Sequence, residues 1–219
     1  MPTSDYHQIP DVLHIVQVCD PRTILDVGVG FGKWGILCRE VLEIYNGRVP
    51  SDVWVRTIDG SEIHEPYRNE LWELAYDHVH IGNALEVLNS LQHYDLILCC
   101  DVIEHFEKAD GLRLLRKLTE HGNVVVVTSP RGYQPQGPIY GNPFERHQSG
   151  WGLEDFHDFI HLYKEIGFTF MVVLAADEND LRGVQVIHPL QTMGVKKGAH
   201  ELLKLAVSRA RERMIGAAK

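Results

Sequence analysis

The sequence has no apolar run long enough to span a bilayer and no excess of basic charge. Residues 1–10 are polar and lack the apolar stretch of a signal peptide, so we expect a cytoplasmic protein without membrane contact. The 219 residues carry a net charge of −9, with a pI of about 5.8. Because such a surface repels phosphate backbones, the charge balance argues against nucleic acid as a partner.

Cysteine is scarce, with four residues in the whole chain, and none of them has a spacing typical of a metal site. Cys99 and Cys100 are adjacent inside an apolar run, and Cys19 and Cys38 stand apart. This usage predicts buried free thiols in a reducing compartment.

Histidine is abundant, with 13 residues, but its spacing gives no metal motif. His157 and His161 stand four residues apart, and His78 and His80 share one face of an expected strand. The metalloprotease pattern H-E-x-x-H fails because Asp158 follows His157. Since a zinc site needs three or four ligands, the sequence predicts no metal.

Hydrophobic residues make up 44% of the chain and charged residues 23%, which is ordinary for a globular protein. We expect one α/β domain over residues 1–219, with a core at 20–130, an irregular acceptor loop or lid at 130–152, and a C-terminal helix within 196–219. The basic residues of that helix predict a solvated face. Its apolar stripe would pack on its own domain or on a second copy, which leaves a homodimer open.

Helix-like and strand-like segments alternate along the chain. The order predicts a doubly wound, seven-stranded sheet that is mostly parallel and closes with an antiparallel hairpin. Expected strands are 23–27, 54–59, 78–83, 94–101, 123–128, 168–175 and 184–187; expected helices are 10–18, 33–45, 65–76, 84–91, 106–120, 153–166 and 201–215.

The segment T-I-L-D-V-G-V-G-F-G-K-W-G, residues 23–35, places glycines between a buried strand and a helix. Gly28, Gly30 and Gly32 accept positive φ and leave no Cβ between the backbone and a ligand. The segment resembles motif I of the class I S-adenosylmethionine-dependent methyltransferases, with Asp26 as the acid before the first glycine. Gly30 to Gly35 also fits G-x-G-x-x-G, the dinucleotide fingerprint, so a nicotinamide-dependent oxidoreductase is an alternative.

Each of the first four expected strands has polar residues at its carboxyl end. Ligands of α/β sheets lie at the carboxyl ends of the strands. The negative charge of Asp26 would repel the pyrophosphate of a dinucleotide. This acid and the closing hairpin favour the methyltransferase over the oxidoreductase. The resemblance, to a bacterial small-molecule branch of the family, implies S-adenosyl-L-methionine as cofactor. It implies ribose binding by Asp59, ammonium binding by Asp26 and adenine binding near Asn83. The expected cofactor-binding set is Asp26, Gly28, Gly30, Gly32, Asp59, Gly60, Asn83, Ala84, Asp101 and Val102.

The methyl acceptor requires a base if it is an oxygen or nitrogen nucleophile. His105 follows the fourth strand in D-V-I-E-H and is the first candidate, although a loop histidine bonded to backbone fits equally. His147 in N-P-F-E-R-H-Q-S-G-W is the second. Aromatic residues of the 130–152 loop either line an acceptor slot or only anchor the loop. These are Tyr133, Tyr140, Phe144 and Trp151.

The fourth strand ends without the N/D-P-P-Y/F motif of adenine and glutamine N-methyltransferases, and no Pro-Cys nucleophile is present. The sequence therefore predicts methyl transfer to a small molecule or sugar, at oxygen. A non-catalytic cofactor-binding module that regulates a partner is a further alternative.

Overall fold

The computed structural model of the chain describes residues 3–49 and 51–185. The predicted C-terminal helix and its basic face lie outside the described residues. Within the described part, no helix has the length and apolar character needed to cross a membrane.

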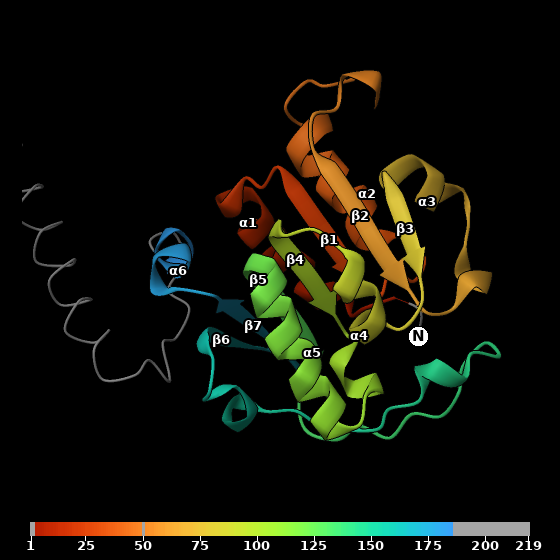
Figure 1. Cartoon of the computed structure of the whole chain (residues 1–219), viewed down its shortest axis with the longest axis vertical. Helices are drawn as coiled ribbons and strands as arrows, with labels where there is room; N and C mark the ends of the chain where they lie inside the picture. Colours follow the sequence, from red (N-terminus) through yellow and green to blue (C-terminus); the bar gives the residue numbers. More distant parts are fainter. Residues whose placement is uncertain (1–2, 50, 186–219) are drawn as a thin grey trace, which may run out of the picture.

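A seven-stranded sheet organises the chain, with the strand order β3-β2-β1-β4-β5-β7-β6 (Figure 1). The first five strands are parallel, while β7 pairs antiparallel with both β5 and β6. The predicted doubly wound sheet with an antiparallel closing hairpin is therefore confirmed. The strands are β1 (Thr23–Val27), β2 (Thr57–Glu62), β3 (His78–Ile81), β4 (Tyr94–Cys100), β5 (Gly122–Pro130), β6 (Ile160–Ile166) and β7 (Thr169–Ala175).

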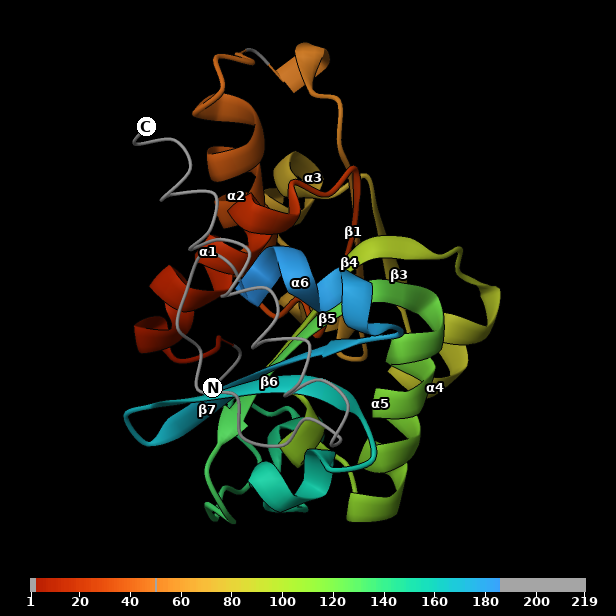
Figure 2. The same cartoon turned by 90° about the vertical axis from the view of Figure 1, so that its left-hand side faces the viewer.

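Helices cover both faces of the sheet (Figures 1 and 2). One face carries α1 (Ile9–Cys19), α2 (Lys33–Arg39), α3 (Glu70–Ala75) and α6 (Glu178–Gln185). The other face carries α4 (Ala84–Val87) and α5 (Lys108–His121). The helix predicted over residues 33–45 is divided, because α2 continues as a π-helical turn, Glu40–Ile44.

The central strands are apolar on both sides because both of their faces are covered. Along β4, Leu96 and Leu98 pack into the cluster under α1 and α2, whereas Ile97 and Cys99 pack under α5. All seven residues of β7 are buried. The four cysteines are free thiols, three of them buried and Cys19 partly exposed.

The closing hairpin is built from a different segment than the sequence predicts. Residues 153–166 form a short 3-10 turn (Leu153–Phe156) followed by β6, so the predicted helix is wrong. A tight turn at Gly167, with φ 59°, joins β6 to β7. The apolar spacing of this segment suits a helix or a strand, and pairing along buried β7 decides between them. Val184, predicted to begin the last strand, lies in α6.

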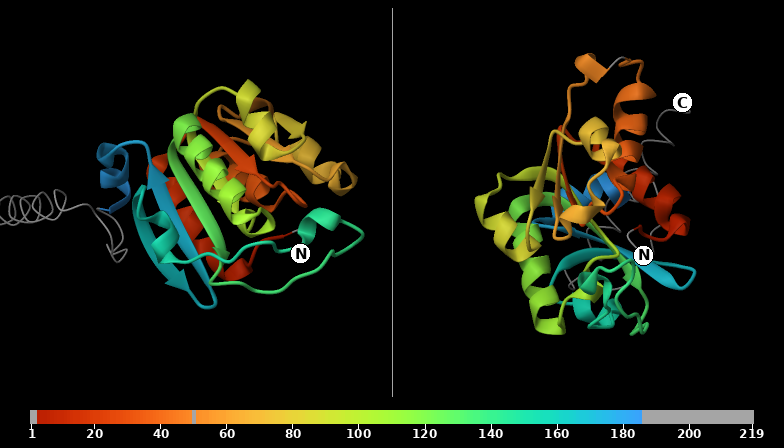
Figure 3. Two further views of the ribbon diagram at one scale, coloured as in Figure 1. Left: turned by 60° about the horizontal axis from the view of Figure 1, so that its bottom comes forward. Right: turned by 90° about the vertical axis from the view of Figure 1, so that its right-hand side faces the viewer.

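The carboxyl ends of β1, β2 and β4 meet at one edge of the sheet. The chain runs outward from β1 through β2 to β3 and then crosses back to β4 on the other side of β1, and this reversal creates the crevice where α/β sheets bind ligands. Two further segments reach this edge, the start of the described chain and the long connection after β5 (Figure 3).

Candidate active site

The glycine loop after β1 has the backbone shape that its sequence predicts. Gly28, Gly30 and Gly32 have φ values of 80°, 54° and 95°, which side chains rarely adopt. A Cβ at Gly28 would lie 2.5 Å from Cγ2 of Val102, so this glycine also permits close approach to the segment after β4. The loop is held by the amide of Gly28, which donates to the carbonyl of Ser61 at 2.8 Å.

A cavity of about 320 Å³ lies beside this loop, and its size falls within the range of small-molecule sites. Of the residues that the sequence predicts for the site, seven line the cavity: Gly28, Gly30, Asn83, Ala84, Asp101, Val102 and His105. Five do not line it: Asp26, Gly32, Asp59, Gly60 and His147. Lining residues that the sequence analysis did not select include Ser4, Lys33, Trp34, Glu62, Tyr67 and Asn142.

The carboxylate at the end of β2 is Glu62, because this strand continues three residues beyond Asp59. Glu62 is buried in the cavity wall and accepts hydrogen bonds from the amides of Gly30 (2.9 Å) and His64 (2.8 Å). Burial raises the pKa of the Glu62 carboxyl, and these two hydrogen bonds oppose the shift. The carboxylate therefore ties the glycine loop to β2 and stands beside the cavity.

Asp59 does not occupy the strand end that the sequence analysis assigned to it. It lies within β2, opposite Leu25 of β1 and His78 of β3. Its carboxylate accepts a hydrogen bond from the hydroxyl of Tyr94 at 2.8 Å, away from the main cavity. The predicted strand end was wrong because Gly60 and Ser61 are poor strand formers by propensity, yet both are buried in the ladder. Gly60 packs beneath the loop, where a Cβ would lie 2.4 Å from a Val29 methyl.

Asp26 lies behind the glycine loop and is 1% exposed. The hydroxyl of Tyr76 donates to its Oδ2 at 2.5 Å, while Oδ1 has no hydrogen-bond partner in the described structure. Burial raises the pKa of Asp26 to about 7, although the Tyr76 hydrogen bond opposes the shift. The same Tyr76 oxygen accepts from the amide of Gly35 at 3.0 Å, so the pair fixes the start of α2.

Asn83 begins α4 as a helix cap, and its Oδ1 accepts from the amide of Leu85 at 3.0 Å. Asn83 and Ala84 nevertheless line the cavity, as the sequence predicts. The structural and the ligand-binding interpretations are compatible here, because an amide side chain has further donors and a second acceptor lone pair.

Asp101 fastens the N-terminal segment across the site. It adopts a positive φ of 57°, and its carboxylate accepts from the amide of Asp5 (2.8 Å), from Nε2 of Gln8 (3.1 Å) and from Oγ1 of Thr128 (3.2 Å). Lys33 reaches the same segment and donates to the carbonyl of Ser4. Residues 3–8 carry no motif or periodicity that points to the site, so this contribution could not be predicted from the sequence.

The two candidate histidines lie close together in the structure, although one precedes β5 in the sequence and the other follows it. His105 ends the 3-10 turn Ile103–His105 after β4, and His147 belongs to the loop after β5. Their ring centroids are 5.0 Å apart. Burial lowers the pKa of His105 to about 4, so its ring is neutral at pH 7.

Glu104, which the sequence analysis did not select, completes this group. It is 3% exposed, and its Oε2 accepts from the hydroxyl of Ser129 at 3.0 Å. Its backbone carbonyl accepts from the amides of Gln148 (2.7 Å) and Ser149 (3.2 Å), which draws the loop against β4. Its position within D-V-I-E-H, next to a predicted site residue, could have identified it. From that motif, only the neighbouring His105 was predicted as a catalytic candidate.

The aromatic residues of the loop after β5 differ in role: some could line the cavity, and others anchor the loop. Phe144 lines the cavity, whereas Tyr133 and Tyr140 are exposed and not part of its wall. Trp151 is 1% exposed, and its Nε1 donates to the hydroxyl of Ser149 at 2.8 Å. Trp151 therefore anchors the loop, and Phe144 is the one of these four aromatic residues that lines the cavity.

No family model matches the sequence, and no curated protein does. Solved structures do match the fold. The bifunctional kinase-methyltransferase WbdD superposes with a TM-score of 0.54 at 16% identity, over 80% of this chain and 40% of that protein. A putative O-methyltransferase of Nostoc punctiforme PCC 73102 gives 0.52 at 18% identity, over 77% and 56%. The methyltransferase domain of bacterial CtHen1 gives 0.52 at 16% identity, over 77% and 97%.

The chain has the class I methyltransferase fold. These structural neighbours are methyltransferases, and the likeness is one of fold at low identity. This confirms the resemblance seen in the glycine loop. The chain spans less than half the length of WbdD, so the activities of that protein do not transfer to it.

Proposed function

We propose that this chain transfers a methyl group from S-adenosyl-L-methionine to a hydroxyl oxygen of a small molecule or sugar. The observation that carries the proposal is the cavity at the carboxyl ends of β1, β2 and β4, which combines the glycine loop with a strand-end carboxylate in a methyltransferase fold.

The residues of this cavity fit the cofactor part by part. Glu62 suits the two ribose hydroxyls, since each carboxylate oxygen keeps a lone pair beyond the hydrogen bond that it accepts from a backbone amide. We assign Asn83 and Ala84, which also line the cavity, to the adenine ring. Lys33 lines the cavity and supplies a cation for a carboxylate.

Two buried polar atoms at this site have no hydrogen-bond partner in the described structure, Oδ1 of Asp26 and Nε1 of Trp34. Buried polar groups are nearly always paired, so unpaired ones at a cavity indicate that a ligand or water belongs there. Trp34 lines the cavity and would donate to a ligand, whereas Asp26 lies behind the loop and is not part of the cavity wall.

When bound, the cofactor supplies an electrophilic methyl group on a sulfonium. The protein's own task is to hold an acceptor oxygen opposite the leaving sulfur and to provide for loss of its proton. His105 is placed for the second part, at the side of the cavity that also contains Phe144 and Gln148. A net charge of −9 supports an acceptor without a polyphosphate backbone.

Calorimetric titration of the purified chain with S-adenosylmethionine, S-adenosylhomocysteine and NADH tests this proposal. We expect the first two to bind and NADH not to bind. In Glu62→Gln, the affinity for the first two should fall about 10- to 100-fold, because hydrogen bonds to a charged group contribute about 1.5–3 kcal/mol.

Asp59→Asn is the matched control, because Asp59 is an equally buried acid of the same strand outside the cavity. It should leave cofactor affinity within about twofold, with folding checked by thermal denaturation. Binding of NADH alone would overturn the proposal in favour of an oxidoreductase. A loss of affinity in Asp59→Asn but not in Glu62→Gln would overturn the assignment of the ribose site.

A further inference from the structure

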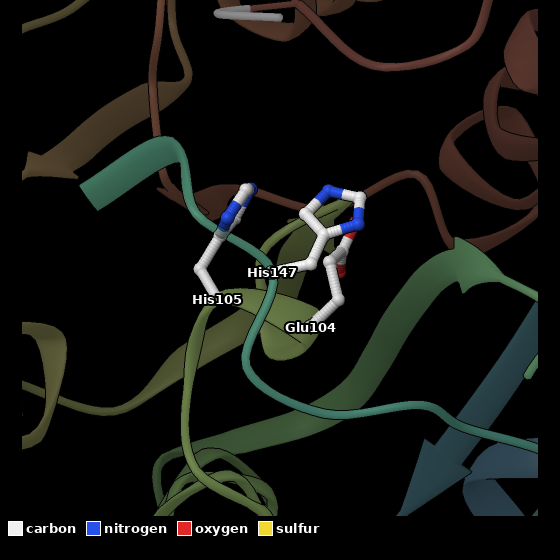
Figure 4. Close-up of side chains that lie close together, drawn as sticks. All are labelled: Glu104, His105 and His147. Atoms are coloured by element: carbon white, nitrogen blue, oxygen red, sulfur yellow. The ribbon is translucent and has the colours of Figure 1, made fainter. Parts of the chain in front are cut away.

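Three side chains with metal-binding atoms converge beside the cavity, and one of them, His105, lines it. Glu104, His105 and His147 each offer one ligand atom, and these atoms all lie within 4.8 Å of one another. Figure 4 shows Glu104 and His105 rising from the turn after β4, with His147 facing them from the loop after β5. Metal bonds of about 2.0–2.2 Å need ligand atoms roughly 3–3.5 Å apart, so no pair of these atoms must close by more than roughly 1.8 Å around an ion.

Both imidazole rings are oriented by backbone carbonyls. Nδ1 of His105 lies 3.2 Å from the carbonyl oxygen of Arg146, and Nδ1 of His147 lies 2.6 Å from that of Gln134. A carbonyl oxygen can only accept, so each Nδ1 carries the proton and each Nε2 keeps its lone pair. Histidines that bind metals are typically held in this way by their second nitrogen.

The carboxylate of Glu104 is also held in place, by the hydroxyl of Ser129. No lysine or arginine among residues 3–49 and 51–185 forms an ion pair with it. A buried carboxylate is costly unless it is paired or coordinates a metal. A cation between Glu104 and the two rings would provide that compensation.

The composition of the group selects the kind of ion. Two imidazoles and one carboxylate suit Mn²⁺, Fe²⁺, Co²⁺ or Zn²⁺, whereas Mg²⁺ and Ca²⁺ favour oxygen ligands. Three protein ligands leave at least one coordination position open, as in catalytic metal sites. His105 is the one of the three that lines the cavity, so it links the group to the space where an acceptor would lie.

We propose that Glu104, His105 and His147 bind a divalent transition-metal ion. Given the proposed function, the acceptor hydroxyl occupies an open position of this ion, and the ion lowers the pKa of that hydroxyl. With Nδ1 of His105 on the Arg146 carbonyl and Nε2 on the ion, that ring assists proton loss through the ion and not as a base, so the hydroxyl proton leaves to water. An oxygen lone pair forms the new bond to the methyl carbon, and the carbon–sulfur bond breaks. Its electron pair stays on sulfur, which gives S-adenosylhomocysteine and the methyl ether.

Metal binding is measured directly on the full chain after treatment with a chelator. Calorimetric titration with Mn²⁺, Zn²⁺ and Mg²⁺, and visible absorption with Co²⁺, should show one equivalent of the transition ions and much weaker Mg²⁺ binding. His105→Gln and His147→Gln should each weaken binding at least tenfold. His157→Gln, at an exposed histidine outside the group, should leave it within twofold.

Thermal denaturation gives a second measurement that does not depend on activity. Saturating Mn²⁺ or Zn²⁺ should raise the melting temperature of the parent chain and of His157→Gln, but not of His147→Gln. Absence of stoichiometric binding, or equal affinity in all three histidine variants, would overturn the proposal. Titration of the same samples with S-adenosylmethionine separates the metal site from the proposed function. If the metal binds and the cofactor does not, only the proposed function is refuted.

Discussion

Asp26 makes the stability of this fold depend on pH in a direction opposite to that of most carboxylates. Its folded pKa, about 7, exceeds the ordinary value of 3.8 because the group is fully buried. Between these two values the folded protein keeps a proton that the unfolded chain has released. Stability from this group is therefore fully present below pH 4 and falls as the pH rises toward 7.

The magnitude follows from the size of the shift. Each unit of pKa difference corresponds to about 1.4 kcal/mol, so a shift of about three units limits the effect to about 4 kcal/mol. Between pH 5 and pH 8, the free energy of unfolding should fall by about 2.5 kcal/mol because of Asp26 alone. Asp26→Asn removes this dependence, since the amide stays neutral and its oxygen still accepts from Tyr76.

The assay is reversible urea denaturation of both proteins at pH 5, 6, 7 and 8. The difference between the two curves isolates Asp26, because the other buried acids are present in both. Tyr76→Phe removes the hydrogen bond that favours the ionised form, so its unfolding free energy should decline further with pH than that of the parent. If the difference in unfolding free energy between the parent and Asp26→Asn is constant from pH 5 to pH 8, the reasoning is refuted.

Two further substitutions test how the site is built. Gly28→Ala places a Cβ 2.5 Å from Val102 at a φ of 80°, so it should cost about 3 kcal/mol of stability in urea denaturation and weaken cofactor binding. Val102→Ala in the same chain should recover part of that loss, and no recovery would show that backbone strain alone is responsible. Trp151→Ala should cost about 3–5 kcal/mol, seen as a lower urea midpoint, because the ring is fully buried. A cost near zero would contradict its role as the anchor of the loop after β5.

The glycine loop and the apolar central strand follow from local patterns that the sequence carries plainly. Gly28, Gly30 and Gly32 are required by positive φ values that other residues rarely adopt, and the apolar run of β4 is required by burial on both faces. These constraints act within a few residues, so sequence reasoning finds them. They were sufficient to predict the fold and the edge of the sheet that holds the cavity.

What only the tertiary structure decided depends on contacts between distant segments. Whether residues 160–166 form a helix or a strand was decided by pairing with β7, and the end of β2 was decided by its neighbours in the ladder. Glu62 replaced Asp59 at the cavity because a strand three residues longer brings a different carboxylate to the edge. His147 reaches Glu104 and His105 only because the loop after β5 folds back across the carboxyl ends, a long-range closure that no local spacing encodes.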